Sequence, residues 1–158
     1  MALTIDQLEM ILGELGARID TVNRPAAELT FSVPTLTMDC PVLARLEQAG
    51  ELLRLGINVA TCPASHPGLA EVHRRMACFN RRHGVIRLGW DESDGAVVAD
   101  ADHWVADGMP TPRQIELLVR SYLTAVCACR PELRAALQVA QPSGNPTPGS
   151  SGPNDETV

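Results

Sequence analysis

The segment HRRMACFNRRHG, residues 73–84, holds more side chains capable of chemistry than any other stretch of this 158-residue sequence. Its two histidines and its cysteine could bind a metal ion. Its two Arg-Arg pairs could instead bind an anion, a nucleic acid or an acidic segment of a protein. The spacing of the polar and apolar residues in this segment helps to decide between these uses.

The four arginines of the segment fall on the outer side of a predicted helix. Residues seven apart nearly coincide on an α-helix, so Arg74 lies with Arg81 and Arg75 lies with Arg82. The opposite face is apolar and carries Leu69, Val72, Met76 and Phe79 at helical spacing. The pattern predicts a buried stripe beneath a solvated, arginine-rich surface. We expect these arginines to bind an acidic segment of a partner protein.

A metal site in this segment would need three ligands that converge on one point. His73 and Cys78 are separated by about 140° around a helix, so they do not converge. The pair Cys127 and Cys129 lacks the C-x₂₋₄-C spacing of zinc sites, and Cys62 with His66 gives only two ligands. The sequence therefore predicts no metal and no cofactor. A metal-dependent regulator or enzyme that uses these histidines and cysteines stays an alternative.

The remaining reactive residues do not form a recognisable catalytic set. Asp100 and Asp102 share one face of a predicted strand, with Asp107 nearby, and paired carboxylates can hold magnesium. No glycine-rich phosphate loop accompanies them, so we expect them on a solvent face. Ser65 and His66 are adjacent, but the chain has no G-x-S-x-G motif. We expect no catalytic residues and a protein that is not an enzyme.

Composition limits the classes of partner. The net charge is −6, which disfavours a general phosphate-binding surface, and we expect neither nucleic acid nor membrane as a partner. A nucleic-acid-binding regulator is kept as an alternative because of the arginines. No apolar run approaches the roughly 18 residues of a membrane span. The start does not resemble a signal peptide, and the cysteine count of five is odd, so we expect reduced thiols in the cytoplasm.

Helices are predicted from capping signals and apolar stripes. Residues 4–7 (TIDQ) and 111–114 (TPRQ) are capping boxes, each with a threonine three positions before a glutamine. The helix between them is expected to end before Gly84. The last long helix is expected to end at Pro131, with a short fourth helix over 131–140.

Alternating apolar and polar residues predict strands over 28–33, 36–40, 53–59, 86–90 and 96–105. Residues 43–50 are predicted as a helical turn or a loop, and Asp94-Gly95 as the positive-φ positions of a hairpin turn. The order α-β-β-β-α-β-β-α indicates one α+β domain over 1–140, with an antiparallel sheet and its helices packed on one face. Residues 141–158 are rich in proline, glycine and serine, and this composition predicts a disordered tail.

Trp104 stands out on the predicted sheet. The alternation of the last strand places it on the polar face with Val98, Asp100 and Asp102. Aromatic residues are enriched at protein interfaces, so Trp104 predicts a partner or subunit surface. The alternative is that it packs under the loop at Met109-Pro110.

The succession of elements resembles that of a known family. The matching features are a helix that ends at Phe79-Asn80, the strand Ile86 to Trp90, the turn at Asp94-Gly95, and a last helix capped by Thr111 and Gln114. Together they resemble the YbjN-like family, which shares the fold of type III secretion chaperones. The resemblance implies a small non-enzymatic domain, commonly a homodimer, that binds an extended segment of a partner protein, and it links the chain to sensory regulation. We therefore expect a chaperone-like or regulatory protein-binding domain that acts through Trp104 and the arginines at 74, 75, 81 and 82.

Overall fold

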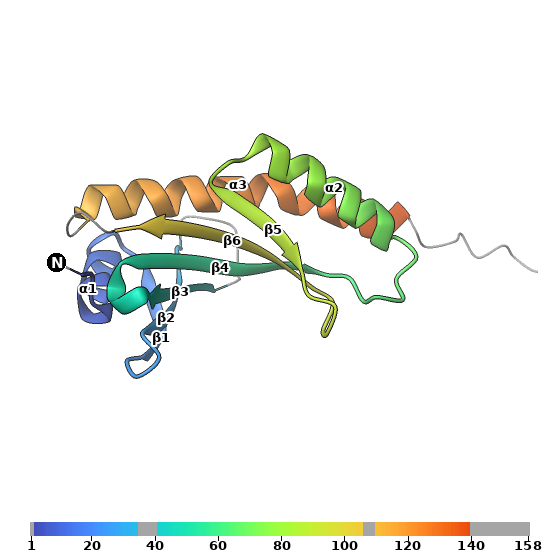
Figure 1. Ribbon diagram of the computed structural model, residues 1–158. Helices are drawn as coiled ribbons and strands as arrows, with labels where there is room; N and C mark the ends of the chain where they lie inside the picture. The colour runs from blue at the N-terminus through green and yellow to red at the C-terminus, as the bar shows by residue number, and fades with distance from the viewer. Residues whose placement is uncertain (1, 35–40, 106–109, 140–158) are drawn as a thin grey trace, which may run out of the picture.

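The computed structural model describes residues 2–34, 41–105 and 110–139 (Figure 1). In this part of the chain, three α-helices and six β-strands follow one another in the order α1-β1-β2-β3-β4-α2-β5-β6-α3, with a 3₁₀ turn η1 (Gln48–Gly50) before β4. The helices are α1 (Ile5–Glu14), α2 (Leu69–Arg82) and α3 (Pro112–Val139). The strands are β1 (Arg18–Asn23), β2 (Glu28–Ser32), β3 (Val42–Glu47), β4 (Leu52–Thr61), β5 (Ile86–Trp90) and β6 (Ala96–Trp104). The predicted strand at 36–40 and the predicted tail lie outside the described residues.

All six strands form one antiparallel sheet in the spatial order β1-β2-β3-β4-β6-β5. Its inward side chains stand opposite one another across the strands, as in the row Leu29, Ala44, Leu55 and Ala101. These side chains and the buried stripes of all three helices form a single core. Figure 1 shows α2 and α3 along the same side of the sheet. The predicted α+β architecture, with an antiparallel sheet and helices on one face, is confirmed.

Two of the described strands before α2, β1 and β3, are not predicted by the sequence pattern. In β1, a bulge between Ile19 and Thr21 lets Ile19 and Val22 face the core although they are three residues apart, so the strand lacks simple alternation. The prediction of a turn or loop over 43–50 is wrong for its first half, because β3 pairs with both β2 and β4. In the β5–β6 turn, Gly95 alone has a positive φ, of 73°, whereas Asp94 accepts a hydrogen bond from the backbone of Ala96.

The sequence predicts where the helices begin more accurately than where they end. The Thr4 hydroxyl accepts from the Gln7 amide at 3.3 Å, and the Thr111 hydroxyl accepts from the Gln114 amide at 3.2 Å, so both capping boxes form. The prediction that Pro131 ends the last helix and that a separate helix follows is wrong, because α3 continues through Pro131 to Val139. Leu133 and Ala136 extend its buried stripe, and their burial offsets the hydrogen bond that proline cannot donate. Among the described residues, no helix is long and apolar enough to cross a membrane.

Candidate functional site

The outward side of the sheet faces away from α2 and α3, and three of its rows of side chains carry the charged residues of β2 to β6; Asn58 and Val98 belong to a further, uncharged row. One row consists of Glu28, Arg45, Arg54 and Asp102 on β2, β3, β4 and β6. The next row consists of Thr30, Leu43, Gly56, Asp100 and Arg87. The third consists of Glu47, Leu52 and Trp104. We call this surface the open face.

Ion pairs tie the first row together. Arg54 donates from Nε to Asp102 Oδ1 at 2.7 Å and from Nη1 to Glu47 Oε1 at 3.0 Å. The hydrogen bond to Asp102 is the largest cause of the raised pKa of Arg54. Arg45 pairs with Glu28 on the neighbouring strand. The charges of these two arginines are therefore balanced by carboxylates of the same surface.

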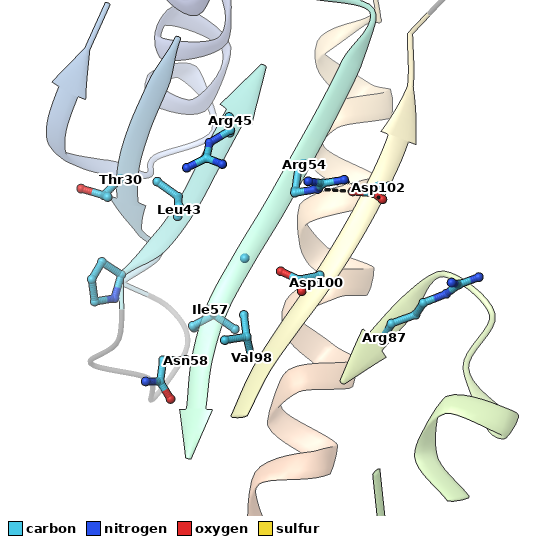
Figure 2. A pocket seen from close by; sticks show the side chains of 12 residues that line it. Thr30, Leu43, Arg45, Arg54, Ile57, Asn58, Arg87, Val98, Asp100 and Asp102 are labelled. Carbon is cyan, nitrogen blue, oxygen red and sulfur yellow. Dashed lines mark hydrogen bonds and ion pairs between the residues drawn. The ribbon is translucent and has the colours of Figure 1, made fainter. Parts of the chain in front are cut away.

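The second row is hollow at its centre, where Gly56 has no side chain. The hollow is a trough of about 680 Å³ that runs over β3, β4 and β6 (Figure 2). Leu43 and Val98 supply apolar lining, and Asp100 points from β6 toward β4. A Cβ atom at position 56 would lie 3.1 Å from Asp100 Oδ1, so glycine leaves the room that this carboxylate occupies. Glycine inside a strand often marks such a close approach.

Asp100 is the least satisfied carboxylate of the open face. It is half-buried, and no described residue donates a hydrogen bond to it. Burial raises its pKa, and the charge of Arg54 opposes that rise only in part. The sequence pairs Asp100 with Asp102 as two equivalent solvent-face carboxylates. The structure separates them, because Asp102 has an arginine partner and Asp100 does not; Asp107 lies outside the described residues.

Trp104 ends β6 on the open face with 58% of its surface exposed. Its cross-strand neighbour is Leu52 on β4, in the row that also holds Glu47. The strand alternation thus places Trp104 where the sequence predicts, beside the ion-paired row. The alternative contact with the loop at 109–110 involves residue 109, which lies outside the described residues.

The four arginines of α2 share a groove with Cys78 and Glu132, the latter from α3. Arg74 and Arg75 both bind Glu71, at 2.6 and 2.7 Å, and lower the pKa of that carboxyl to about 2. Arg82 pairs with Glu132 at 3.2 Å, and Arg81 donates to the Cys78 sulfur at 3.3 Å. The helix therefore brings these arginines together as predicted. Two carboxylates balance part of their charge, and the sequence pattern does not predict these ion pairs.

His66, His73 and His83 contact neighbours within the fold. His73 packs edge-on against the Trp90 ring at 5.0 Å, and His83 stacks on Phe79 at 4.1 Å. His66 Nδ1 accepts a hydrogen bond from the backbone of Gly68 at 3.0 Å. Within residues 2–34, 41–105 and 110–139, no three His, Cys, Asp or Glu side chains converge to hold a metal ion.

The sequence pattern does not mark Arg54 and Gly56 as parts of a site. The signal for Gly56 is its place inside the apolar strand sequence LRLGINV, residues 53–59, where a glycine weakens the strand. Arg54 gave no such signal, because an arginine on the polar face of a strand is ordinary. Only the pairing of β4 with β6 brings it to Asp102.

Comparison with solved structures places this architecture among known folds. The crystal structure of YbjN from E. coli, described as "a putative transcription regulator", superposes with a TM-score of 0.65 at 14% identity, covering 88% of this chain and 96% of that chain. One chain of the HopA1–SchA chaperone–effector complex gives 0.56 at 13% identity, covering 78% and 90%. One chain of the heterodimeric ExoU–SpcU complex, from the type III secretion system of Pseudomonas aeruginosa, gives 0.54 at 15% identity, covering 81% and 98%. The chain thus has the type III secretion chaperone-like fold that the sequence predicts.

Sequence comparison identifies the family. No curated protein matches the sequence significantly. The family model named YbjN and described as "Putative bacterial sensory transduction regulator" matches residues 4–135, which include every described strand and most of α3. The chain therefore belongs to the YbjN family.

Proposed function

We propose that this protein is a non-enzymatic, chaperone-like or regulatory domain that binds a segment of a partner protein on the open face of its sheet. The observation that carries the proposal is that open face itself. It is hollowed at Gly56, and Trp104 is exposed on the same face, beyond the row of Arg54 and Asp102. A concave surface with an exposed aromatic residue on the same face is typical of protein recognition.

The structural relatives support protein binding as the class of activity. Two of the similar chains come from complexes between proteins, one a chaperone–effector complex and the other a heterodimer. Their low identity to this chain gives the fold alone, so the partner of this protein has to be found by experiment. We place the protein in the cytoplasm, where the free thiols of Cys62, Cys78, Cys127 and Cys129 would stay reduced.

The α2 groove is a second proposed contact surface. Its four arginines face two glutamates, Glu71 and Glu132, so the groove keeps a net positive charge in an acidic protein. Such a groove suits an acidic stretch of the partner protein. We further propose that the protein acts as a homodimer, with Trp104 at or near the contact between the two subunits.

The test is capture of partners by tagged protein that carries a photo-crosslinking amino acid on the open face at Asn58. Crosslinked peptides identify the partner and the segment of it that touches the trough. The matched variants are Trp104→Asp and Met10→Asp, since the two side chains are equally exposed, at 58% and 57%, and Met10 lies on α1. We expect Trp104→Asp to abolish crosslinking and Met10→Asp to leave it unchanged.

Light scattering on the same variants tests the homodimer. The wild-type protein should have twice the chain mass of 17.0 kDa, and Trp104→Asp should lower it to that of one chain. Unchanged mass together with unchanged crosslinking in Trp104→Asp would refute the role of Trp104. Crosslinking that persists after the four arginines of α2 are changed to glutamine would restrict the binding surface to the open face.

A further inference from the structure

We propose that the trough on the open face binds a lysine or arginine side chain of the partner segment, with the Asp100 carboxylate as its acceptor. This inference rests on the proposed function, because it names the chemistry of the bound segment. It starts from the contrast between Asp100 and the other carboxylates of the open face, all of which have arginine partners.

The charges of the open face leave Asp100 without a partner. Glu28, Glu47 and Asp102 are held by Arg45 and Arg54 through ion pairs. Arg87 stands opposite Asp100 in the strand register, but Figure 2 shows its side chain directed away from Asp100, and the described residues contain no ion pair between the two. The three rows thus carry four carboxylates and three arginines. Asp100, the carboxylate of these rows that has no ion pair among the described residues, lines the trough.

The shape of the trough suits the stem of a basic side chain. Leu43 and Val98 line it, and the lack of a side chain at Gly56 leaves room for the Asp100 carboxylate. Lysine and arginine bury their methylene groups on apolar surface while their charged ends reach a polar partner. A cation at Asp100 would donate to a carboxylate that receives no hydrogen bond from the described residues. Such charge-assisted bonds are stronger than neutral ones, and partial burial strengthens them further.

An anionic ligand fits this trough less well. Three arginines line it: Arg45 and Arg54 are already in ion pairs, and the Arg87 side chain is directed away from Asp100 (Figure 2). An anion bound at Arg45 or Arg54 would have to displace Glu28, Glu47 or Asp102, and it would lie against the Asp100 carboxylate. The trough therefore selects a basic residue, whereas the α2 groove suits an acidic one. Together the two surfaces describe a partner with charges of both signs.

The first experiment titrates the isolated protein with butylguanidinium chloride and follows the backbone amide signals of Gly56 and Val98 by NMR. Sodium chloride at the same ionic strength is the blank. We expect saturable shifts in the wild type and at least about fivefold weaker binding in Asp100→Asn. Gly56→Ala should weaken binding too, because its Cβ would meet Asp100 Oδ1 at 3.1 Å. Glu92→Gln removes an exposed carboxylate of the β5–β6 turn and should bind as the wild type does.

Shifts no larger than those with sodium chloride would overturn the proposal, as would equal binding by Asp100→Asn. Folding of each variant is checked by the dispersion of its NMR spectrum. Asp100→Asn preserves the size of the side chain, so loss of binding there reports the charge rather than the packing.

The second experiment uses the crosslinked partner segment as a synthetic peptide. Each of its lysines and arginines is replaced by glutamine in turn, and one replacement should weaken binding about tenfold to the wild type but not to Asp100→Asn. If Trp104→Asp abolishes binding while Asp100→Asn and every such peptide bind normally, this inference fails and the proposed function stands. If butylguanidinium binds at Asp100 but no partner crosslinks, the cation site stands and the proposed function fails.

Discussion

Replacing Tyr122 with phenylalanine should make the protein less stable at neutral pH and relatively more stable at alkaline pH. Tyr122 on α3 is 1% exposed, and its hydroxyl donates to the backbone carbonyl of Ala99 on β6 at 2.6 Å. The hydrogen bond fixes the long helix to the central part of the sheet. Its loss should lower the free energy of unfolding by about 1 kcal/mol at pH 7.

The alkaline effect follows from the pKa of the same hydroxyl. Burial raises the pKa of Tyr122 far above its ordinary value of about 10, and the charge of Asp100 adds to the rise. The unfolded chain therefore loses this proton first. The contribution of Tyr122 to stability is complete below about pH 10 and falls by about 1.4 kcal/mol for each pH unit above it. The stability curves of the two proteins should cross between about pH 10 and 11.

Urea unfolding, followed by tryptophan fluorescence at several pH values, measures both effects. The chain has a single tyrosine and no lysine, so tyrosinate absorbance reports Tyr122 alone and few other groups titrate in this range. Burial also raises the pKa of Cys129, to about 11, but this contribution is common to both proteins and cancels in their difference. Tyrosinate absorbance that rises near pH 10 while the protein is still folded would refute the argument. Parallel stability curves would refute it too.

Three other predictions concern separate parts of the fold. Asn80→Ala removes two hydrogen bonds to the Leu88 backbone, of 3.0 and 2.8 Å. It should lower the free energy of unfolding by about 1–3 kcal/mol and speed hydrogen exchange of the Leu88 amide. Asn80→Asp, which keeps the acceptor for that amide, is the control, and unchanged exchange in Asn80→Ala would contradict the prediction. Gly95 and Gly16 both have a positive φ, of 73° and 77°, but only at position 95 would a new Cβ meet backbone atoms, at 2.8 Å. Gly95→Ala should therefore lower the thermal unfolding temperature more than Gly16→Ala does. Equal losses of stability in the two variants would show that the strain of the positive φ, about 1–2 kcal/mol, accounts for both effects and that the backbone contact adds nothing. Glu71 should titrate with a pKa of about 2 by NMR and higher when either arginine partner is changed to alanine; a wild-type midpoint near 4 would disprove the double ion pair.

The sequence predicts the elements whose signals are local. The two capping boxes fix where α1 and α3 begin, because a threonine and a glutamine three residues later bind each other's backbone regardless of the rest of the fold. The apolar stripe of α2 and the alternation of β5 and β6 likewise follow from side-chain periodicity.

The sequence pattern does not predict the elements whose conformation depends on residues far away along the chain. β3 has residues that also suit a helix, and it is a strand because β2 and β4 flank it. In β1, the bulge between Ile19 and Thr21 interrupts the alternation of apolar and polar residues that would mark a strand. α3 passes Pro131 because Leu133 and Ala136 find the core beyond it.

In the candidate site, too, local sequence patterns predict some features and only the tertiary structure determines others. The alternation of β6 by itself determined that Trp104 and Asp102 lie on the polar face, and the helical repeat determined that the four arginines of α2 gather on one side. Only the tertiary structure decided which of these charges are balanced. Asp102 pairs with Arg54, and the Asp100 carboxylate occupies the room beside Gly56, because β4 pairs with β6 across 48 residues of sequence from Arg54 to Asp102. Periodicity assigns a side chain to a face, whereas its partners come from strand register, which is set by the packing of the whole sheet.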